Sequence, residues 1–174
     1  MCVRMAYQPT MTAAHALALA SGCFLSGAMF CISAVMVPAL LDTDAESSSL
    51  VAHWARLYHY GSMMMPSMSA AITIVYVYAA AQYHQSRRKQ RVRCVAAGAL
   101  TMAIVPFTFY AMAPTNNALF AMGNAAPDAD ETARSLVIKW AVLHAVRSCM
   151  PLAGVMVASV GLPEAQQPGG SSEK

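Results

Sequence analysis

The chain has 174 residues, of which 57% are hydrophobic and only 11% are charged, and its formal net charge is +3. Soluble globular domains carry about 25% charged residues, and here the charges leave three uncharged runs of 37, 30 and 34 residues. Because a bilayer is crossed by about 20 apolar residues, the composition predicts an integral membrane protein and argues against a soluble domain, a disordered chain or a nucleic-acid-binding protein.

The first apolar stretch, residues 13–41, predicts a membrane span. It is too long for a cleavable signal peptide and has no basic start, so we expect it to be retained. Pro38 is expected to bend or end this helix, and a polar loop follows from Asp42 to Ser49.

A second span is expected over residues 50–83, with a kink at Pro66. Its first part mixes apolar, aromatic and polar residues, as helices do at a membrane interface. Trp54 and Tyr58 are four residues apart and therefore share a helix face. An interfacial aromatic belt explains this pair about as well as the wall of a substrate site does.

The segment from His84 to Arg93 is strongly basic and holds five of the eleven Lys and Arg residues. A basic run beside predicted spans is typical of a cytoplasmic loop whose side chains lie near anionic headgroups. With an even number of spans, both termini are then expected in the cytoplasm, and the acidic first and third loops on the other side.

The third span is expected over residues 94–113. The Pro-Thr-Asn-Asn sequence at 114–117 predicts a turn with caps for a short following helix. Asn116 and Asn117 then lie at the mouth of the third span, where a turn-and-cap role and a ligand-binding role are about equally expected.

The fourth span, residues 136–160, contains charges that a bilayer disfavours. Lys139 lies near its start and can extend to the interface, but Arg147 lies roughly 15 Å into the helix, close to the bilayer midplane. A charge costs about 2.5 to 3.5 kcal/mol there even on the mildest scale. Its partner is expected among loop acids such as Asp42 or Asp128, or among amides, hydroxyls, carbonyls or a bound anion. We therefore expect Arg147 to be functional.

Helical geometry places Trp140, His144, Arg147 and Pro151 within a sector of about 60°. One face thus offers a flat aromatic ring, a titratable base and a fixed cation, which favours a functional site over a structural histidine. Motifs for nucleotide binding, phosphoryl transfer or zinc binding are absent from the sequence, and its five cysteines include no CxxC pair.

Three stretches of the chain, Pro106–Phe120, Lys139–Gly154 and Trp54–Pro66, resemble the fungal anthrone oxygenase family, and the likeness extends from the first span to Gly154. The resemblance implies an all-α, four-helix membrane enzyme of aromatic polyketide biosynthesis. Such a monooxygenase converts an anthrone to the anthraquinone with O2, without flavin, haem or added metal. The resemblance also implies an endoplasmic reticulum location, with enzymes of the pathway as candidate partners.

The implied chemistry assigns roles to the unusual residues. The central CH2 of an anthrone is acidic because deprotonation gives an extended aromatic phenolate, which can pass an electron to O2. We expect His144 to act as the general base and Arg147 to stabilise the enolate and the peroxide. The substrate is expected to contact Trp54, Tyr58, Asn116, Asn117 and Trp140.

Other functions are compatible with the same features. The chain could be a non-catalytic membrane carrier or scaffold for hydrophobic polyketides, which would bind without consuming oxygen. It could also be a metal-dependent oxygenase that uses His144 with His53 or His59, although these two lie on different helix faces. We expect one four-helix domain over residues 1–162 and a flexible tail over 163–174.

Overall fold

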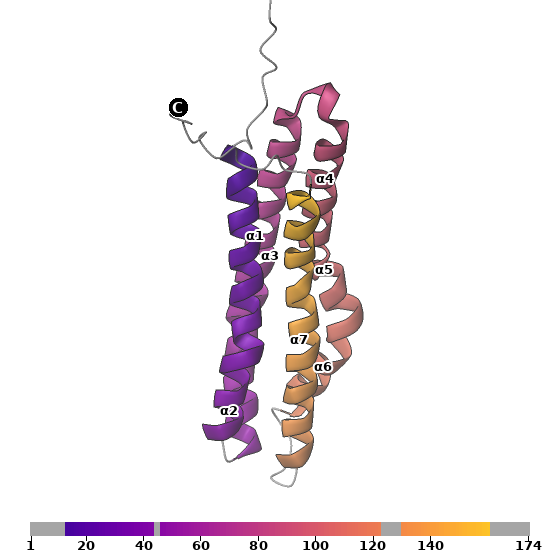
Figure 1. Ribbon diagram of the computed structural model, residues 1–174. Helices are drawn as coiled ribbons and strands as arrows, with labels where there is room; N and C mark the ends of the chain where they lie inside the picture. Colours follow the sequence, from indigo (N-terminus) through magenta and orange to yellow (C-terminus); the bar gives the residue numbers. More distant parts are fainter. Residues whose placement is uncertain (1–12, 44–45, 123–129, 161–174) are drawn as a thin grey trace, which may run out of the picture.

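The computed structural model describes residues 13–43, 46–122 and 130–160, and every regular element in these ranges is a helix (Figure 1). The helices join into four long rods. The first rod consists of α1 (Ala13–Cys31), the π-helix η1 (Ile32–Met36) and α2 (Val37–Thr43), and the second is α3 (Ser47–Gln82). The third consists of the 3-10 helix η2 (Gln85–Arg87), α4 (Arg88–Met102), α5 (Ile104–Phe107), the π-helix η3 (Thr108–Met112) and α6 (Ala113–Met122). The fourth is α7 (Asp130–Ser159).

All four rods are long and apolar enough to cross a membrane. This confirms the prediction of an all-α integral membrane bundle of four helices. The helical rod that contains the predicted third span, 94–113, runs from Gln85 to Met122. The basic segment continues into the first turns of α4 instead of ending before it. The predicted tail, 163–174, lies outside the described residues.

The turn expected at residues 114–117 is wrong, because these residues form the first part of α6. Proline cannot donate a hydrogen bond to the carbonyl four residues earlier, and its ring crowds that carbonyl. For Pro114 this carbonyl belongs to Tyr110, at the middle of η3. The widened π-helical turn accommodates the proline, so the chain stays helical.

In the first rod, too, a π-helical turn lies four residues before a proline. Pro38 lies four residues after Ala34, the middle of η1, and α2 continues past it to Thr43. At Pro106 the helix is interrupted instead, since α4 ends at Met102, four residues before it. Prolines therefore create the irregular turns of the first and third rods.

Small residues bring the rods close together in the half of the bundle where α4 begins. A Cβ atom added to Gly154 of α7 would lie 2.8 Å from the carbonyl oxygen of Ala97 in α4. One added to Gly22 of α1 would lie 2.7 Å from the Val155 side chain of α7. At these two positions the helices of this half are in close contact.

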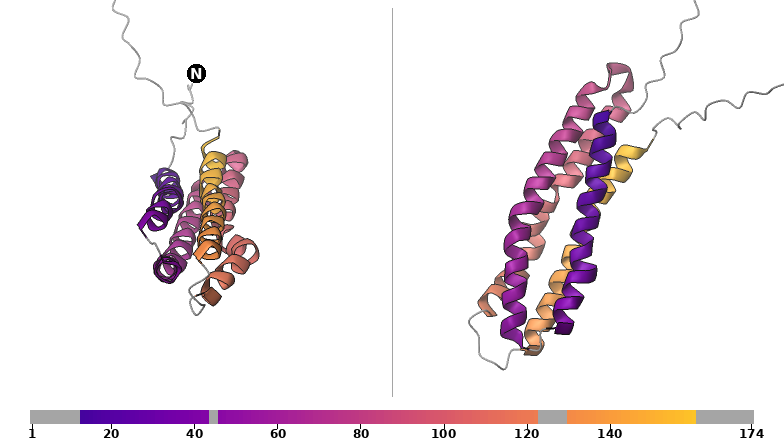
Figure 2. Two further views of the ribbon diagram at one scale, coloured as in Figure 1. Left: turned by 90° about the horizontal axis from the view of Figure 1, so that it is seen from below. Right: turned by 90° about the vertical axis from the view of Figure 1, so that its left-hand side faces the viewer.

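The other half of the bundle is wider. Figures 1 and 2 show α5, η3 and α6 leaning away from the other rods. A buried apolar cluster holds this half together, and it includes Val37, Leu50, Trp54, Met112, Leu119, Val137 and Trp140. The departure of the third rod leaves room for a cavity beside this cluster.

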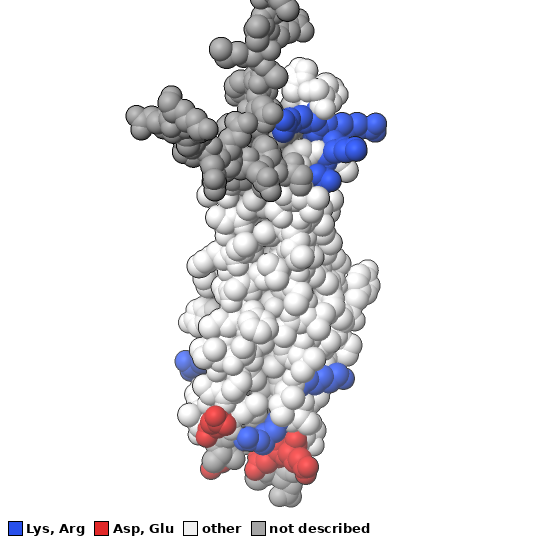
Figure 3. All heavy atoms as spheres, viewed as in Figure 1, with Lys and Arg blue, Asp and Glu red and all other residues white. Residues whose placement is uncertain are grey.

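Charge separates the two ends of the molecule. Figure 3 shows a cluster of Lys and Arg where α4 begins, Asp and Glu with a few further basic side chains toward the opposite end, and a wide uncharged band between them. Lys139 on α7 and Val160, just beyond its end, are 21 positions apart, which corresponds to about 31 Å of helix and is close to the roughly 30 Å of a hydrocarbon core. Arg93 donates to the carbonyl of Val160 at 2.6 Å, which ties the basic end of α4 to the end of α7.

Candidate active site

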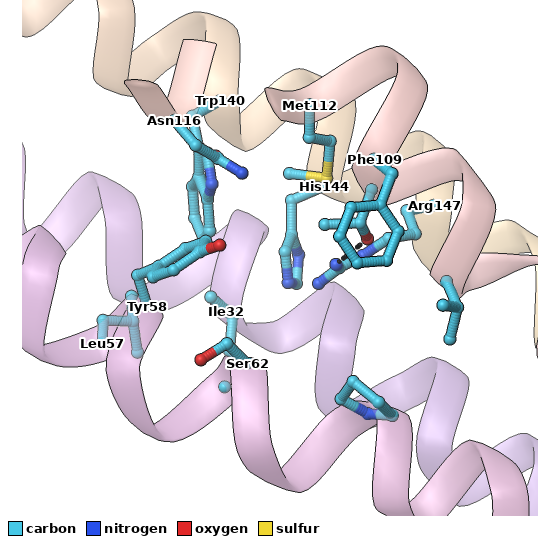
Figure 4. Close-up of a pocket in the computed structure, with 14 residues that line it drawn as sticks. Ile32, Leu57, Tyr58, Ser62, Phe109, Met112, Asn116, Trp140, His144 and Arg147 are labelled. Atoms are coloured by element: carbon cyan, nitrogen blue, oxygen red, sulfur yellow. Dashed lines mark hydrogen bonds between the residues drawn. The ribbon is translucent and has the colours of Figure 1, made fainter. Parts of the chain in front are cut away.

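A cavity of about 680 Å³, its open mouth included, lies among η1, α3, the third rod and α7. Small-molecule sites typically measure about 300 to 1,000 Å³. Figure 4 shows the side chains that line it. They are Ile32, Leu57, Tyr58, Gly61, Ser62, Pro66, Val105, Thr108, Phe109, Met112, Asn116, Trp140, His144 and Arg147.

The polar side of the cavity is built by α7. Trp140, His144 and Arg147 follow one another at helical spacing and all line the cavity, whereas Pro151 is buried elsewhere. The ring centroids of Trp140 and His144 lie 4.8 Å apart with their planes tilted by 30°. The helical periodicity of α7 therefore places an aromatic ring, an imidazole and a guanidinium group on one wall.

His144 is 2% exposed and is held by the first rod. Its Nδ1 atom lies 3.0 Å from the Ser33 hydroxyl of η1. Ser33 could not be predicted from the sequence, because a lone serine in an apolar span does not differ from a serine that only packs between helices. The contact arises only because η1 packs against α7.

The hydrogen-bond partner of Arg147 is a hydroxyl group and not a carboxylate. Its Nη1 donates to Thr108 Oγ1 at 2.7 Å, and the Thr108 hydroxyl donates to the Ile104 carbonyl at 2.7 Å. Asp42, one of the loop acids that could have reached it, lines no part of the cavity, and Asp128 lies outside the described residues. Among the described residues, the partner of the guanidinium group is therefore neutral and does not compensate its charge.

The two adjacent asparagines are separated by the fold. Asn116 is 4% exposed and lines the cavity, whereas Asn117 is exposed and lines no part of it. Successive residues of a helix point about 100° apart, so the helical conformation of 114–117 lets only one of them face inward. The expected substrate contact therefore fits Asn116 and does not fit Asn117.

Trp54 also takes a different place from the one expected. It is fully buried and does not line the cavity. Its ring packs against Tyr58, Phe120 and Trp140, with centroids 5.4, 5.0 and 6.1 Å away. Trp54 thus supports Tyr58 and Trp140, which do line the cavity, from behind.

Several polar atoms of the wall make no hydrogen bond with the described part of the chain. They are Asn116 Oδ1, Trp140 Nε1 and Arg147 Nε, all of them buried. A buried polar atom left unpaired costs about 1 to 3 kcal/mol, so their concentration at one cavity is typical of a site that binds a polar or anionic group.

His53 and His59, the two histidines considered as metal ligands together with His144, do not line its cavity. His53 lines a separate shallow groove on the outside of the bundle, and His59 lines neither that groove nor the cavity of His144. Within residues 13–43, 46–122 and 130–160, no group of three or more His, Cys, Asp or Glu side chains could hold a metal ion.

Comparison with known proteins gives a consistent result. The sequence profile of the family described as "Anthrone oxygenase" matches residues 54–157, which hold every cavity residue except Ile32. "Anthrone oxygenase" of Claviceps purpurea is 57% identical over 162 residues, covering 90% of this chain and 92% of that protein. "Anthrone oxygenase AgnL2" of Paecilomyces divaricatus is 40% identical over 156 residues, covering 86% and 95%. "Anthrone oxygenase nsrD" of Aspergillus novofumigatus is 42% identical over 147 residues, covering 84% and 91%. No solved structure gives a significant match.

Proposed function

This chain belongs to the anthrone oxygenase family and is an oxygenase that acts on an anthrone, and from that premise we propose that the reaction takes place in the cavity beside α7. The observation that carries the proposal is the wall made by His144 and Arg147, a base and a cation on consecutive turns inside an otherwise apolar cavity. In the overall reaction a CH2 group and O2 become a ketone and water. One oxygen atom enters the product and the other leaves in water.

The first step is removal of a proton from the central CH2 by His144. Ser33 Oγ lies 3.0 Å from Nδ1. A hydroxyl oxygen can accept a hydrogen bond, so a proton on Nδ1 would point to Ser33 and leave Nε2 with the free lone pair. The lone pair of Nε2 then takes the proton, and the C–H electrons pass into the aromatic phenolate.

The second step joins the anion to O2. One electron passes from the phenolate to O2, which gives a carbon radical and superoxide, and these recombine to form the C–O bond of a peroxide. The negative charge moves from the substrate oxygen to the peroxide oxygen. Arg147, which has no carboxylate partner in the described part of the chain, is placed to stabilise both anions.

The third step forms the quinone. Protonated His144 returns its proton to the peroxide and then takes the remaining C–H proton. The electrons of that C–H bond form the C=O bond as the O–O bond breaks. The leaving hydroxide receives the proton from His144 and departs as water, so the base ends as it began.

The remaining walls hold a flat, apolar molecule. Tyr58 and Trp140 offer aromatic rings, and Met112 offers a flexible apolar side chain. Asn116 can hydrogen-bond a ring oxygen of the substrate through its side-chain amide. An apolar lining excludes bulk water from the peroxide, which protects the intermediate from side reactions.

The proposal includes no organic cofactor and no metal, with O2 as the only co-substrate. Its support is chemical, since an electron-rich phenolate reduces O2 by itself. If this is correct, turnover by purified protein persists after treatment with a strong chelator. Loss of turnover on chelation, restored by one metal ion, would contradict this part of the proposal.

The decisive experiment measures oxygen uptake by detergent-solubilised protein given emodin anthrone. Anthrones oxidise slowly in air, so the rate is compared with a blank without enzyme. We expect one quinone formed for each O2 consumed, and a fall of about 100-fold or more in His144→Ala and in Arg147→Ala. Binding of the anthrone without uptake above the blank would instead favour the carrier or scaffold. Wild-type turnover in both variants would overturn the assignment of the two residues.

We also propose an endoplasmic reticulum location with both termini in the cytoplasm. The start of α1, the end of α7 and the basic start of α4 lie at the same end of the bundle (Figure 1), and a basic end is retained on the cytoplasmic side. Enzymes that make the anthrone or consume the quinone would then meet this protein at the membrane surface.

A further inference from the structure

The cavity is closed at the end nearer the acidic side of the molecule. There the rings of Trp54, Tyr58, Phe120 and Trp140 pack together, with centroids of neighbouring rings 5.0 to 6.1 Å apart. Neither Trp54 nor Phe120 lines the cavity, so the cavity stops at this cluster. These packed rings block access to the cavity from the water on that side.

The cavity is also closed toward the basic end. Beyond Pro66 and Val105, its last lining residues in that direction, α3 and α4 are joined directly. Ser69 Oγ donates to the Thr101 carbonyl at 2.7 Å, and Thr73 Oγ1 donates to the Gly98 carbonyl at 3.1 Å. No path follows the bundle axis between these hydrogen-bonded helices.

The open side lies between α3 and η3. Phe109, which lines the cavity, is 71% exposed, and Ser62 on the facing helix is exposed as well. Gly61, which precedes Ser62 on α3, also lines the cavity, and a Cβ atom added there would meet no heavy atom within 4 Å. The wall of the cavity is therefore missing at Gly61, and Figure 4 shows Phe109 and Ser62 on opposite sides of the space.

This opening lies at the depth of the hydrocarbon. Arg147, on the far wall, is eight residues beyond Lys139, or about 12 Å along α7. The residues beside the opening are large and apolar on their outer faces. Met63, Met64 and Tyr110 are 53%, 55% and 86% exposed. The mouth therefore faces lipid and not water.

We infer that this opening is a lateral portal through which a planar apolar substrate passes from the bilayer into the cavity, with Gly61 as the residue that keeps it open. The inference rests on the proposed function for the nature of the substrate. Burial of apolar surface draws such a molecule into the bilayer at about 25 cal/mol per Å². A portal in the lipid lets the substrate enter while water stays out of the reaction site.

The test is a size series at Gly61 in proteoliposomes. Gly61→Ala adds only a methyl group at the mouth and is expected to have a smaller effect than the larger Leu side chain. Gly61→Leu narrows the mouth, and we expect the association and dissociation rates of the anthraquinone product to fall together, each by about tenfold, with little change in Kd. Stopped-flow quenching of tryptophan fluorescence measures both rates, since Trp140 lines the cavity. The kcat/KM for the anthrone should fall by a similar factor.

The matched control is Gly27→Leu on α1. An added Cβ there also meets no heavy atom within 4 Å, so this variant makes the same change on the outside of the bundle away from the portal. A second variant, Phe109→Ala, widens the mouth and should speed both rates. Its control is Phe24→Ala, which removes a ring that is 67% exposed on α1.

Two results would overturn the portal. One is unchanged binding and turnover in folded Gly61→Leu and Phe109→Ala protein. The other is a raised Kd in Gly61→Leu at an unchanged association rate, which would make Gly61 part of the binding site and not of the path. Binding of the quinone product can be measured without turnover. If the wild-type protein binds the quinone with the expected dependence on Gly61 but oxidises no anthrone, the proposed function is wrong and the portal stands.

Discussion

At the scale of single residues, the unusual feature is that both reactive side chains are held by hydroxyl groups. Ser33 holds His144 and Thr108 holds Arg147. A carboxylate beside Arg147 would neutralise the charge that an enolate or a peroxide needs. A hydroxyl satisfies one N–H of the guanidinium and fixes its direction while leaving the positive charge available to a bound anion.

We predict that Thr108→Val lowers kcat by about tenfold while the protein stays folded, because valine has nearly the shape of threonine but accepts no hydrogen bond from Arg147. The control is Thr73→Val, which removes a hydroxyl hydrogen bond to the Gly98 carbonyl away from the cavity. Oxygen uptake at saturating anthrone gives kcat. Equal values for the two variants would show that Thr108 has no role in positioning Arg147.

The two asparagines provide a second test at this scale. Asn116→Ala is expected to raise KM by about tenfold, because the amide that can reach a substrate oxygen is lost. Asn117→Ala changes the adjacent exposed residue and is expected to behave as wild type. The comparison needs only steady-state kinetics. A larger effect at Asn117 than at Asn116 would contradict the placement of α6.

At the scale of elements, prolines and glycines shape the bundle. The π-helical turns η1 and η3 each centre on the residue four before a proline, and each supplies a side chain that holds the reactive groups of α7. Short π-helical segments are frequent at functional sites. In the other half of the bundle, glycines have the opposite effect and let the rods approach one another closely.

We predict that Gly154→Ala destabilises the protein by about 1 to 3 kcal/mol, because the added Cβ would have to push α7 away from the backbone of α4. The distance to the Ala97 carbonyl oxygen would be only 2.8 Å. Thermal unfolding in detergent should show a lower midpoint than for wild type. Gly27→Ala, whose Cβ lies in open space, is the control, and equal midpoints for the two variants would contradict the close approach of α4 and α7.

At the scale of the whole molecule, charge sets the orientation. The basic cluster at the start of α4, made of Arg87, Arg88, Lys89, Arg91 and Arg93, lies at the same end as the start of α1 and the end of α7 (Figures 1 and 3). Residues with acidic side chains lie at the other end. Near that end Ser47 N donates to Asp130 Oδ1 at 2.9 Å, which joins the starts of α3 and α7.

We predict that tags placed at either end of the chain are both exposed to the cytoplasm. Protease treatment of sealed microsomes should remove both tags. Replacing the five residues of the basic cluster by glutamine should leave a mixed orientation, because the positive charges that retain this end are lost. Protection of one tag and loss of the other would contradict a bundle with an even number of spans.

The class of the protein, its four spans, the separation of basic and acidic ends and the shared face of Trp140, His144 and Arg147 could all be predicted from the sequence. Each of these depends on composition or on helical spacing along one segment, which can be read without knowing which helices meet. The residues that complete the site could not be predicted in this way. Ser33 and His144 are 111 residues apart and Thr108 and Arg147 are 39 apart, so their pairing depends on where the rods cross. The same crossings place Trp54 behind the cavity wall, turn Asn116 toward the cavity and leave Asn117 exposed. They also leave the cavity open beside Gly61. In each case the surroundings of a side chain are set by the neighbouring helices and not by its own segment.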